Sequence, residues 1–165
     1  DVALKGCSNY ALHIPGSTSE TILVATRCEF ANSNYGAMIC GKLTSAKFNN
    51  CVFRDNVGDG MYVSECTIHL HGEATAIHSN GDDGIFAHVC GKVIIHLPSH
   101  HNTVYNNGGE DRNTSSGGTI TNVEWRMFKK KKTRVGSWGF EILWKGVLGK
   151  ERIWLQLDAL IKNSW

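Results

Sequence analysis

The sequence has little net charge and no long apolar run. Its 165 residues include 17 Lys and Arg against 15 Asp and Glu, which gives a formal net charge of +2. Such a balance does not indicate a nucleic-acid-binding protein, because these proteins carry an excess of positive charge. No stretch of about 18 or more apolar residues occurs, so the sequence predicts no helix that crosses a membrane.

Proline is scarce, and helical periodicity is missing from the first 120 residues. The chain has two prolines but 18 glycines, together with many Asn, Ser and Thr residues. This composition indicates frequent tight turns rather than long helices. A chain of this length is long enough to bury a hydrophobic core as one domain.

One short motif recurs at a fixed interval, and it organises the rest of the chain. It reads Asn-Val-Gly-Asp-Gly-Met-Tyr-Val at residues 56–63 and Asn-Gly-Asp-Asp-Gly-Ile-Phe-Ala at residues 80–87. A weaker copy occupies residues 34–39. One glycine of each copy is evenly spaced along the chain, at Gly36, Gly60 and Gly84. A fixed period of about 24 residues indicates a solenoid or a propeller.

The repeats hold short stretches of alternating apolar and polar residues, as at residues 67–70 and 93–97, separated by Asn, Gly and Asp turns. A propeller blade needs four longer antiparallel strands, whereas a period of this length suits one coil of three short strands. The sequence therefore predicts an all-β fold, a right-handed parallel β-helix of about five coils over residues 1–123. Stacked asparagines near the turns are expected at Asn34, Asn56, Asn80 and Asn107.

The composition changes after Val123. Residues 129–132 are four lysines, and the apolar positions of residues 151–162 fit one face of a short helix. Since a solenoid needs its open ends covered, the sequence predicts that residues 124–165 form a cap or tail containing this helix. A homo-oligomer that forms through this tail is a further expectation. All five tryptophans lie in it: Trp125, Trp138, Trp144, Trp154 and Trp165.

Coils in which Asn-x-x-x-Gly precedes three largely apolar residues and a short β run resemble the right-handed parallel β-helix repeats of the pectate-lyase-like superfamily. The resemblance covers roughly residues 4–123. It implies a fold that polysaccharide lyases, polygalacturonase-like hydrolases, phage tailspikes and non-enzymatic sugar-binding or scaffold domains share. It therefore implies the fold more closely than the function.

Three aspartates are candidate catalytic residues. Asp59 and Asp83 stand at one phase of the repeat, so they should stack on adjacent coils, where like charges raise one pKa or bind a cation. In polygalacturonase-like relatives, an Asp-Asp pair and a third Asp on a neighbouring coil perform acid and base catalysis. Asp82-Asp83 is similar to that pair, and Asp59 would be the third. The His-Gly and Arg-x-Lys motifs of that family are missing, and the alternative is that these residues form turns.

Three histidines are candidate metal ligands. His69 and His71 are two residues apart on an expected strand, so they point to the same face, and His96 on the next coil should lie beside them. Three imidazoles in this arrangement could hold Zn²⁺. The alternative is a polar outer face of a solvated sheet. No cofactor is expected.

Five of the six cysteines recur at intervals close to that of the repeat, from Cys7 to Cys28 to Cys51 and again from Cys66 to Cys90. Cysteines at one phase stack with parallel side chains, which makes a disulfide awkward. Reduced thiols are therefore expected, which leans towards an intracellular protein.

Together these features predict a non-catalytic binding or scaffold module for a carbohydrate polymer or a partner protein. Its stacked flat faces suit an elongated ligand. The alternative is a small polysaccharide hydrolase or lyase that uses Asp59, Asp82 and Asp83.

Overall fold

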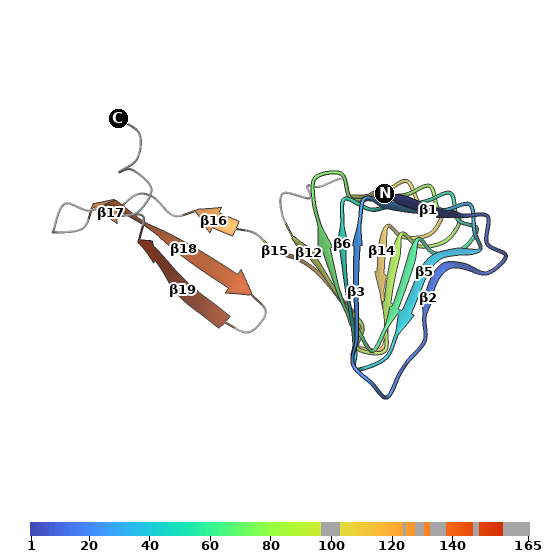
Figure 1. Ribbon diagram of the computed structural model, residues 1–165, viewed down its shortest axis with the longest axis horizontal. Helices are drawn as coiled ribbons and strands as arrows, with labels where there is room; N and C mark the ends of the chain where they lie inside the picture. Colours follow the sequence, from blue (N-terminus) through green and yellow to red (C-terminus); the bar gives the residue numbers. More distant parts are fainter. Residues whose placement is uncertain (97–102, 124, 128–130, 133–137, 147–148, 157–165) are drawn as a thin grey trace. The chain divides into compact units, whose positions relative to one another are not determined.

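The computed structural model describes the backbone of residues 1–96, 103–123, 125–127, 131–132, 138–146 and 149–156, and side chains up to residue 123 (Figure 1). The chain divides into two compact units, Asp1–Asn122 and Val123–Trp165, and each is treated by itself. The described residues form strands and no helix. Accordingly, none of them forms a helix long and apolar enough to span a membrane.

The first unit is built from three parallel sheets, and every coil contributes one strand to each. Sheet A contains β1 (Val2–Lys5), β4 (Cys28–Ala31), β7 (Val52–Arg54), β10 (Ala76–His78) and β13 (Val104–Tyr105). Sheet B contains β2 (Tyr10–Ile14), β5 (Tyr35–Cys40), β8 (Met61–Ser64), β11 (Ile85–His88) and β14 (Arg112–Thr114). Sheet C contains β3 (Thr21–Thr26), β6 (Thr44–Asn49), β9 (Thr67–His71), β12 (Lys92–His96) and β15 (Thr119–Val123). The structure confirms a parallel β-helix of five coils.

The three sheets enclose one hydrophobic core. Figure 1 shows sheet A across the top and sheets B and C converging below it. Alternation along each strand turns every second side chain inward. Phe30, Phe53 and Ile77 occupy the same register position in successive coils, and the rings of Phe30 and Phe53 stack with centroids 4.7 Å apart. Phe48 from sheet C meets Phe53 edge-on at 5.1 Å. Repetition of one apolar position thus produces a continuous stack of side chains.

The repeated glycines lie where the start of sheet B passes close to the next coil. A Cβ added to Gly36 would lie 2.3 Å from the carbonyl oxygen of Gly60, and one added to Gly60 would lie 2.8 Å from that of Gly84. These oxygens accept hydrogen bonds from Ala37 and Met61, which hold the coils together. The regular interval between these glycines therefore marks a position where only glycine fits.

Each corner after a sheet A strand turns on a single residue with a left-handed backbone. The φ angles are 50° at Asn32, 54° at Asp55, 56° at Ser79 and 57° at Asn106. Asn and Asp adopt this conformation more readily than other residues with a side chain. The corner therefore explains part of the Asn and Asp content of the repeats.

The residue after each of these corners forms a buried polar ladder. Asn56, Asn80 and Asn107 stack as the sequence predicts, and the side-chain oxygen of Asn80 accepts a hydrogen bond of 2.9 Å from the side-chain amide of Asn56. The prediction for Asn34 is wrong, because Ser33 holds the equivalent place in the second coil and donates its backbone N–H to the Asn56 oxygen at 3.1 Å. Ser33 lies 23 residues before Asn56, so Asn34 is one residue past the ladder position.

The six cysteines are all free thiols. Cys28 and Cys51 do stack, because Glu29 pairs with Val52 in the next coil. The expected stack of Cys66 on Cys90 is wrong, since Lys92 pairs with Thr67 and places Gly91 beside Cys66. Cys7 is also outside the Cys28 stack, because Val2 occupies that phase in the first coil. The fourth coil has one extra residue at the corner, where Val89 and Cys90 both have left-handed φ angles.

The second unit is antiparallel. The strand β18 (Trp138–Gly146) pairs with β16 (Trp125–Met127), β17 (Lys131–Lys132) and β19 (Gly149–Gln156). The predicted helix over residues 151–162 is wrong for residues 151–156, which lie in β19 and pair continuously with β18. Apolar spacing in a short segment fits either element, and here the hairpin satisfies the backbone. Residues 157–162 lie outside the described residues, and a cap or an oligomer formed by this unit stays a prediction.

Candidate functional site

The structure brings Asp59 and Asp83 to the same position in adjacent coils, directly before the repeat glycines. Oδ1 of Asp59 accepts the backbone N–H of Asp83 at 3.0 Å. Oδ1 of Asp83 in turn accepts the N–H of Glu110 at 2.8 Å, and its Oδ2 accepts the side-chain amide of Asn113 at 2.8 Å. Each carboxylate therefore ties its own coil to the next one. Asp82 is exposed beside them.

Asp59 has an unusual protonation equilibrium for an aspartate. Burial raises its pKa to about 6, the charges of Asp83 and Asp82 add to this effect, and the hydrogen bond from the Asp83 amide opposes it. A raised pKa suits a general acid, but the Asp59 side chain is only 7% exposed and is bonded to the backbone of its own chain. The geometry favours a role in the fold.

The outer face of sheet B carries two pairs of aromatic side chains, Tyr10 with Tyr35 and Tyr62 with Phe86. Met38, Tyr62 and Phe86 share one register position on β5, β8 and β11. The rings of Tyr62 and Phe86 meet edge-on with centroids 5.5 Å apart, and those of Tyr10 and Tyr35 in the first two coils are 5.6 Å apart. We call this surface the aromatic face. Its members are all half-buried: Tyr10, Tyr35, Met38, Tyr62, Phe86 and His88.

Sequence reasoning missed the aromatic face, although a signal was present. The residue two places after each repeat glycine is Met38, Tyr62 or Phe86. Large apolar residues this close to a glycine in a strand are easily assigned to the core. Here the residue directly after each glycine points inward, and alternation turns the next one outward.

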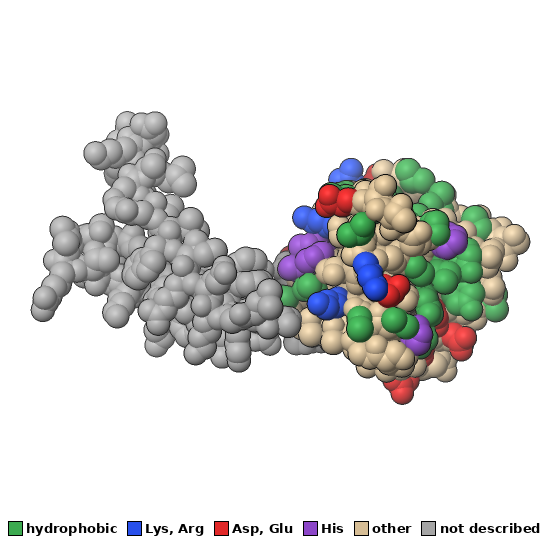
Figure 2. Space-filling model, turned by 90° about the horizontal axis from the view of Figure 1, so that it is seen from below, with side chains coloured by type: hydrophobic (Ala, Val, Ile, Leu, Met, Phe, Trp, Pro, Cys, Tyr) green, Lys and Arg blue, Asp and Glu red, His purple; other side chains and the backbone are tan. Residues whose placement is uncertain are grey.

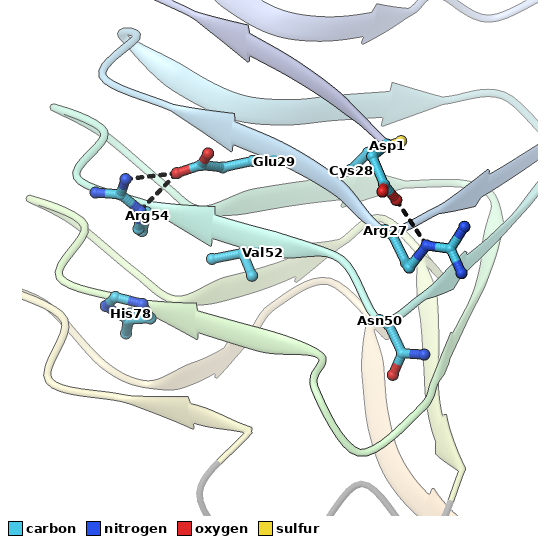
Figure 3. Close-up of a pocket in the computed structure, with 8 residues that line it drawn as sticks. All are labelled: Asp1, Arg27, Cys28, Glu29, Asn50, Val52, Arg54 and His78. Carbon is cyan, nitrogen blue, oxygen red and sulfur yellow. Dashed lines mark hydrogen bonds and ion pairs between the residues drawn. The ribbon is translucent and has the colours of Figure 1, made fainter.

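Sheet A carries an open groove of about 650 Å³ on its outer face (Figure 3). Its charged groups are paired. Arg27 Nε contacts Asp1 Oδ1 at 2.6 Å, and the Arg54 guanidinium contacts Glu29 Oε1 at 2.5 Å and also Asp55. A hydrogen bond from Lys5 and the Arg54 contact lower the pKa of Glu29. The lining residues are Asp1, Arg27, Cys28, Glu29, Asn50, Val52, Arg54 and His78.

Because these charges neutralise one another within the groove, neither Arg27 nor Arg54 is available for an anionic ligand without breaking an existing ion pair. The aromatic face therefore has the stronger case as a binding surface.

The three predicted histidines lie together on the outer face of sheet C. Nδ1 of His69 and Nε2 of His96 are 2.8 Å apart, and the rings of His71 and His96 stack with centroids 4.0 Å apart. One nitrogen from each of the three lies within 4.8 Å of the others. Figure 2 shows histidine side chains in contact at the surface, beside Lys or Arg side chains.

Burial keeps these histidines neutral. It lowers the pKa of His69 and of His71, and the charge of Lys47 lowers both further. Burial together with the neighbouring histidines lowers the pKa of His96 to about 4. The cluster therefore presents uncharged imidazoles at neutral pH.

No protein-family model matches this chain, and neither the comparison with curated proteins nor the one with solved structures found a match. The fold therefore rests on the structure itself, and the likeness of its repeats to the pectate-lyase-like superfamily remains a resemblance.

Proposed function

We propose that this protein is a non-catalytic binding module that holds a carbohydrate polymer along the aromatic face of sheet B. The observation that carries the proposal is the pair of rings of Tyr62 and Phe86, which are in register on adjacent strands. Aromatic rings with one solvent-facing side are suited to the C–H faces of sugar rings, and their polar tips remain available for hydroxyl groups.

The spacing of the face supports an extended ligand. Neighbouring strands of a sheet lie about 4.8 Å apart, which is close to the length of one sugar unit in an extended polymer. The centroid separations of 5.6 Å for Tyr10 and Tyr35 and 5.5 Å for Tyr62 and Phe86 follow this spacing. Each pair of rings therefore offers contacts from two adjacent coils to neighbouring sugar units.

Polar groups on the face complement the rings. Burial raises the pKa of Tyr62, so its hydroxyl stays protonated as a hydrogen-bond donor. His88 is held by Ser115, with 2.6 Å between Nδ1 and the Ser115 oxygen, which leaves Nε2 for a ligand. The resemblance of the repeats to those of the pectate-lyase-like superfamily supports a polysaccharide as the ligand.

The position of the aspartates supports binding without catalysis. Glycoside hydrolysis needs two carboxyl groups that flank the scissile bond. Asp59 is buried, and both oxygens of Asp83 accept hydrogen bonds from the next coil. Neither is presented to a ligand on the aromatic face.

A glycan array followed by titration of the polymers that bind tests this function. We expect Tyr62→Ala and Phe86→Ala each to weaken binding about tenfold, because each removes one ring contact worth about 1.4 kcal/mol. Val24→Ala is the matched control, since Val24 is an exposed apolar residue on sheet C and its removal should leave affinity unchanged.

Three results would contradict the proposal. The first is that no polysaccharide binds, which would favour a partner protein as the ligand. The second is that the Tyr62→Ala, Phe86→Ala double variant binds as the wild type does. The third is the release of new reducing ends or unsaturated products from a bound polymer, which would replace a binding module with an enzyme.

A further inference from the structure

We propose that His69, His71 and His96 form a binding site for one divalent transition-metal ion, with Zn²⁺ as the best fit, on the outer face of sheet C. The site lies on a different sheet from the aromatic face, so the proposal does not depend on carbohydrate binding. It rests on the positions of three imidazole nitrogens and on the strands that hold them.

The nitrogen positions are close to those of a tetrahedral site. Two nitrogens bound to one Zn²⁺ at about 2.0–2.1 Å lie about 3.3 Å apart in tetrahedral geometry. The nitrogens of His69 and His96 are 2.8 Å apart, and all three ligand atoms lie within 4.8 Å of one another. Small side-chain rotations, which separate the stacked rings of His71 and His96, bring all three to the required spacing.

The strands that carry these side chains are hydrogen-bonded to neighbouring strands on both sides. β9 is an inner strand of sheet C, hydrogen-bonded to β6 on one side and to β12 on the other. Alternation puts His69 and His71 on one face of it, and the pairing of Leu70 with Ile95 places His71 opposite His96. A ligand set on paired strands holds its geometry better than one on loops.

The chemistry of the ligands selects the metal. Imidazole nitrogens suit Zn²⁺, Cu²⁺ and Ni²⁺, whereas Ca²⁺ and Mg²⁺ prefer oxygen ligands. Three protein ligands leave a fourth position for water or for a group from a ligand, because the histidines are half-buried rather than enclosed.

The short contact between His69 and His96 means that one proton must move before a metal can bind. At 2.8 Å one of the two nitrogens carries a proton and donates a hydrogen bond, and the other nitrogen accepts that bond. Metal binding replaces that proton, which moves through water to the other nitrogen of the same neutral ring. Both rings then bind through lone pairs, with no oxidation or reduction and no net proton release.

Lys47 limits the affinity of the site. It lies on β6 in register with His69, and its positive charge acts on all three histidines. Repulsion between Lys47 and a bound cation opposes binding. Lys47→Ala should therefore bind the metal several-fold more tightly than the wild type, an effect that a merely structural lysine would not produce.

Calorimetric titration of the full chain with Zn²⁺, and visible absorption with Co²⁺ as a spectroscopic probe, test the site. We expect one ion per chain, a Co²⁺ spectrum of tetrahedral type and a rise in melting temperature. His69→Ala, His71→Ala and His96→Ala should each weaken binding by more than tenfold, because loss of a ligand costs at least as much as loss of a residue that supports one.

Two control variants make the test specific. His78→Ala removes a half-buried histidine from sheet A, and the double variant His100→Ala, His101→Ala removes two histidines that follow the site in the sequence and lie outside the described residues. Both should bind as the wild type does. Melting temperatures measured without metal identify any variant that fails to fold. At such a position a glutamine variant, for example His96→Gln, replaces the alanine variant.

The proposal fails if Zn²⁺ does not bind at micromolar concentration, if Co²⁺ gives an octahedral spectrum, or if the His100, His101 variant loses binding while the three single variants keep it. A Lys47→Ala variant that binds more weakly than the wild type would also contradict it.

Discussion

Replacing Asn80 with alanine is expected to destabilise the β-helix by about 3–5 kcal/mol, because it leaves several buried polar groups without partners. The side-chain oxygen of Asn80 accepts both the backbone and the side-chain N–H of Asn56, at 3.2 and 2.9 Å. Its side-chain amide donates to the carbonyl oxygen of Phe53 at 3.3 Å and to Asn107 at 2.9 Å. Asn80 is 2% exposed, so water does not replace these bonds easily.

Thermal and urea denaturation of the full chain would measure the loss, which corresponds to a fall of about 10–20 °C in melting temperature. Asn34→Ala is the matched control, because the structure places Ser33 rather than Asn34 in the ladder. That variant should lose much less stability. Equal losses for the two variants would show that the ladder does not hold the coils together.

Replacing Asp59 with asparagine is expected to stabilise the protein above pH 6, by about 1–2 kcal/mol. The pKa of Asp59 rises from its usual 3.8 to about 6 on folding, mainly through burial. Ionising it in the folded state costs at most about 3 kcal/mol at neutral pH. Asparagine removes this cost and keeps an oxygen that can accept the Asp83 N–H. The amide it adds needs a partner of its own, which reduces the gain.

The sign of the pH dependence follows from the higher pKa of the folded state. Between about pH 4 and pH 6 the folded protein holds a proton that the unfolded chain has lost, so the free energy of unfolding of the wild type falls as the pH rises through this window. Above it the cost is constant. The advantage of Asp59→Asn is therefore small near pH 4 and complete above pH 6.

Urea denaturation of both proteins between pH 4 and pH 8 would test this expectation. Asp82→Asn serves as the control, because Asp82 is exposed and its substitution should change stability little at any pH. If wild type and Asp59→Asn show parallel pH profiles, Asp59 is not a buried acid of raised pKa.

The sequence predicted the features that depend on repetition. The interval between Gly36, Gly60 and Gly84 revealed the period, and the structure shows that each glycine meets the backbone of the next coil. A period of this size has few architectures, so the parallel β-helix followed from it. The proximity of Asp59 to Asp83, and of His69 and His71 to His96, was predicted for the same reason, because residues at one phase of the repeat stack on adjacent coils.

Register was less predictable where a coil gains or loses a residue. An extra residue at the corner after β11 separated Cys66 from Cys90, and Ser33 rather than Asn34 lies in the ladder because the interval to Asn56 is 23 residues. Such changes hardly alter the composition of a coil, yet they decide which side chains face each other across strands. In the second unit, residues 151–156 form a strand because pairing with β18 outweighed a helix-like spacing.

By itself the sequence determined the period, the all-β class and the stacking of equivalent residues, because these follow from local alternation and from glycines that admit no side chain. Only the tertiary structure decided which stacked residues are used by the fold and which remain at the surface. The Asp59 carboxylate is buried and bonded, whereas the rings of Tyr62 and Phe86 and the three histidines lie on outer faces. The physical reason is that burial depends on whether a side chain faces the core or the solvent, and the register with the neighbouring coils decides this.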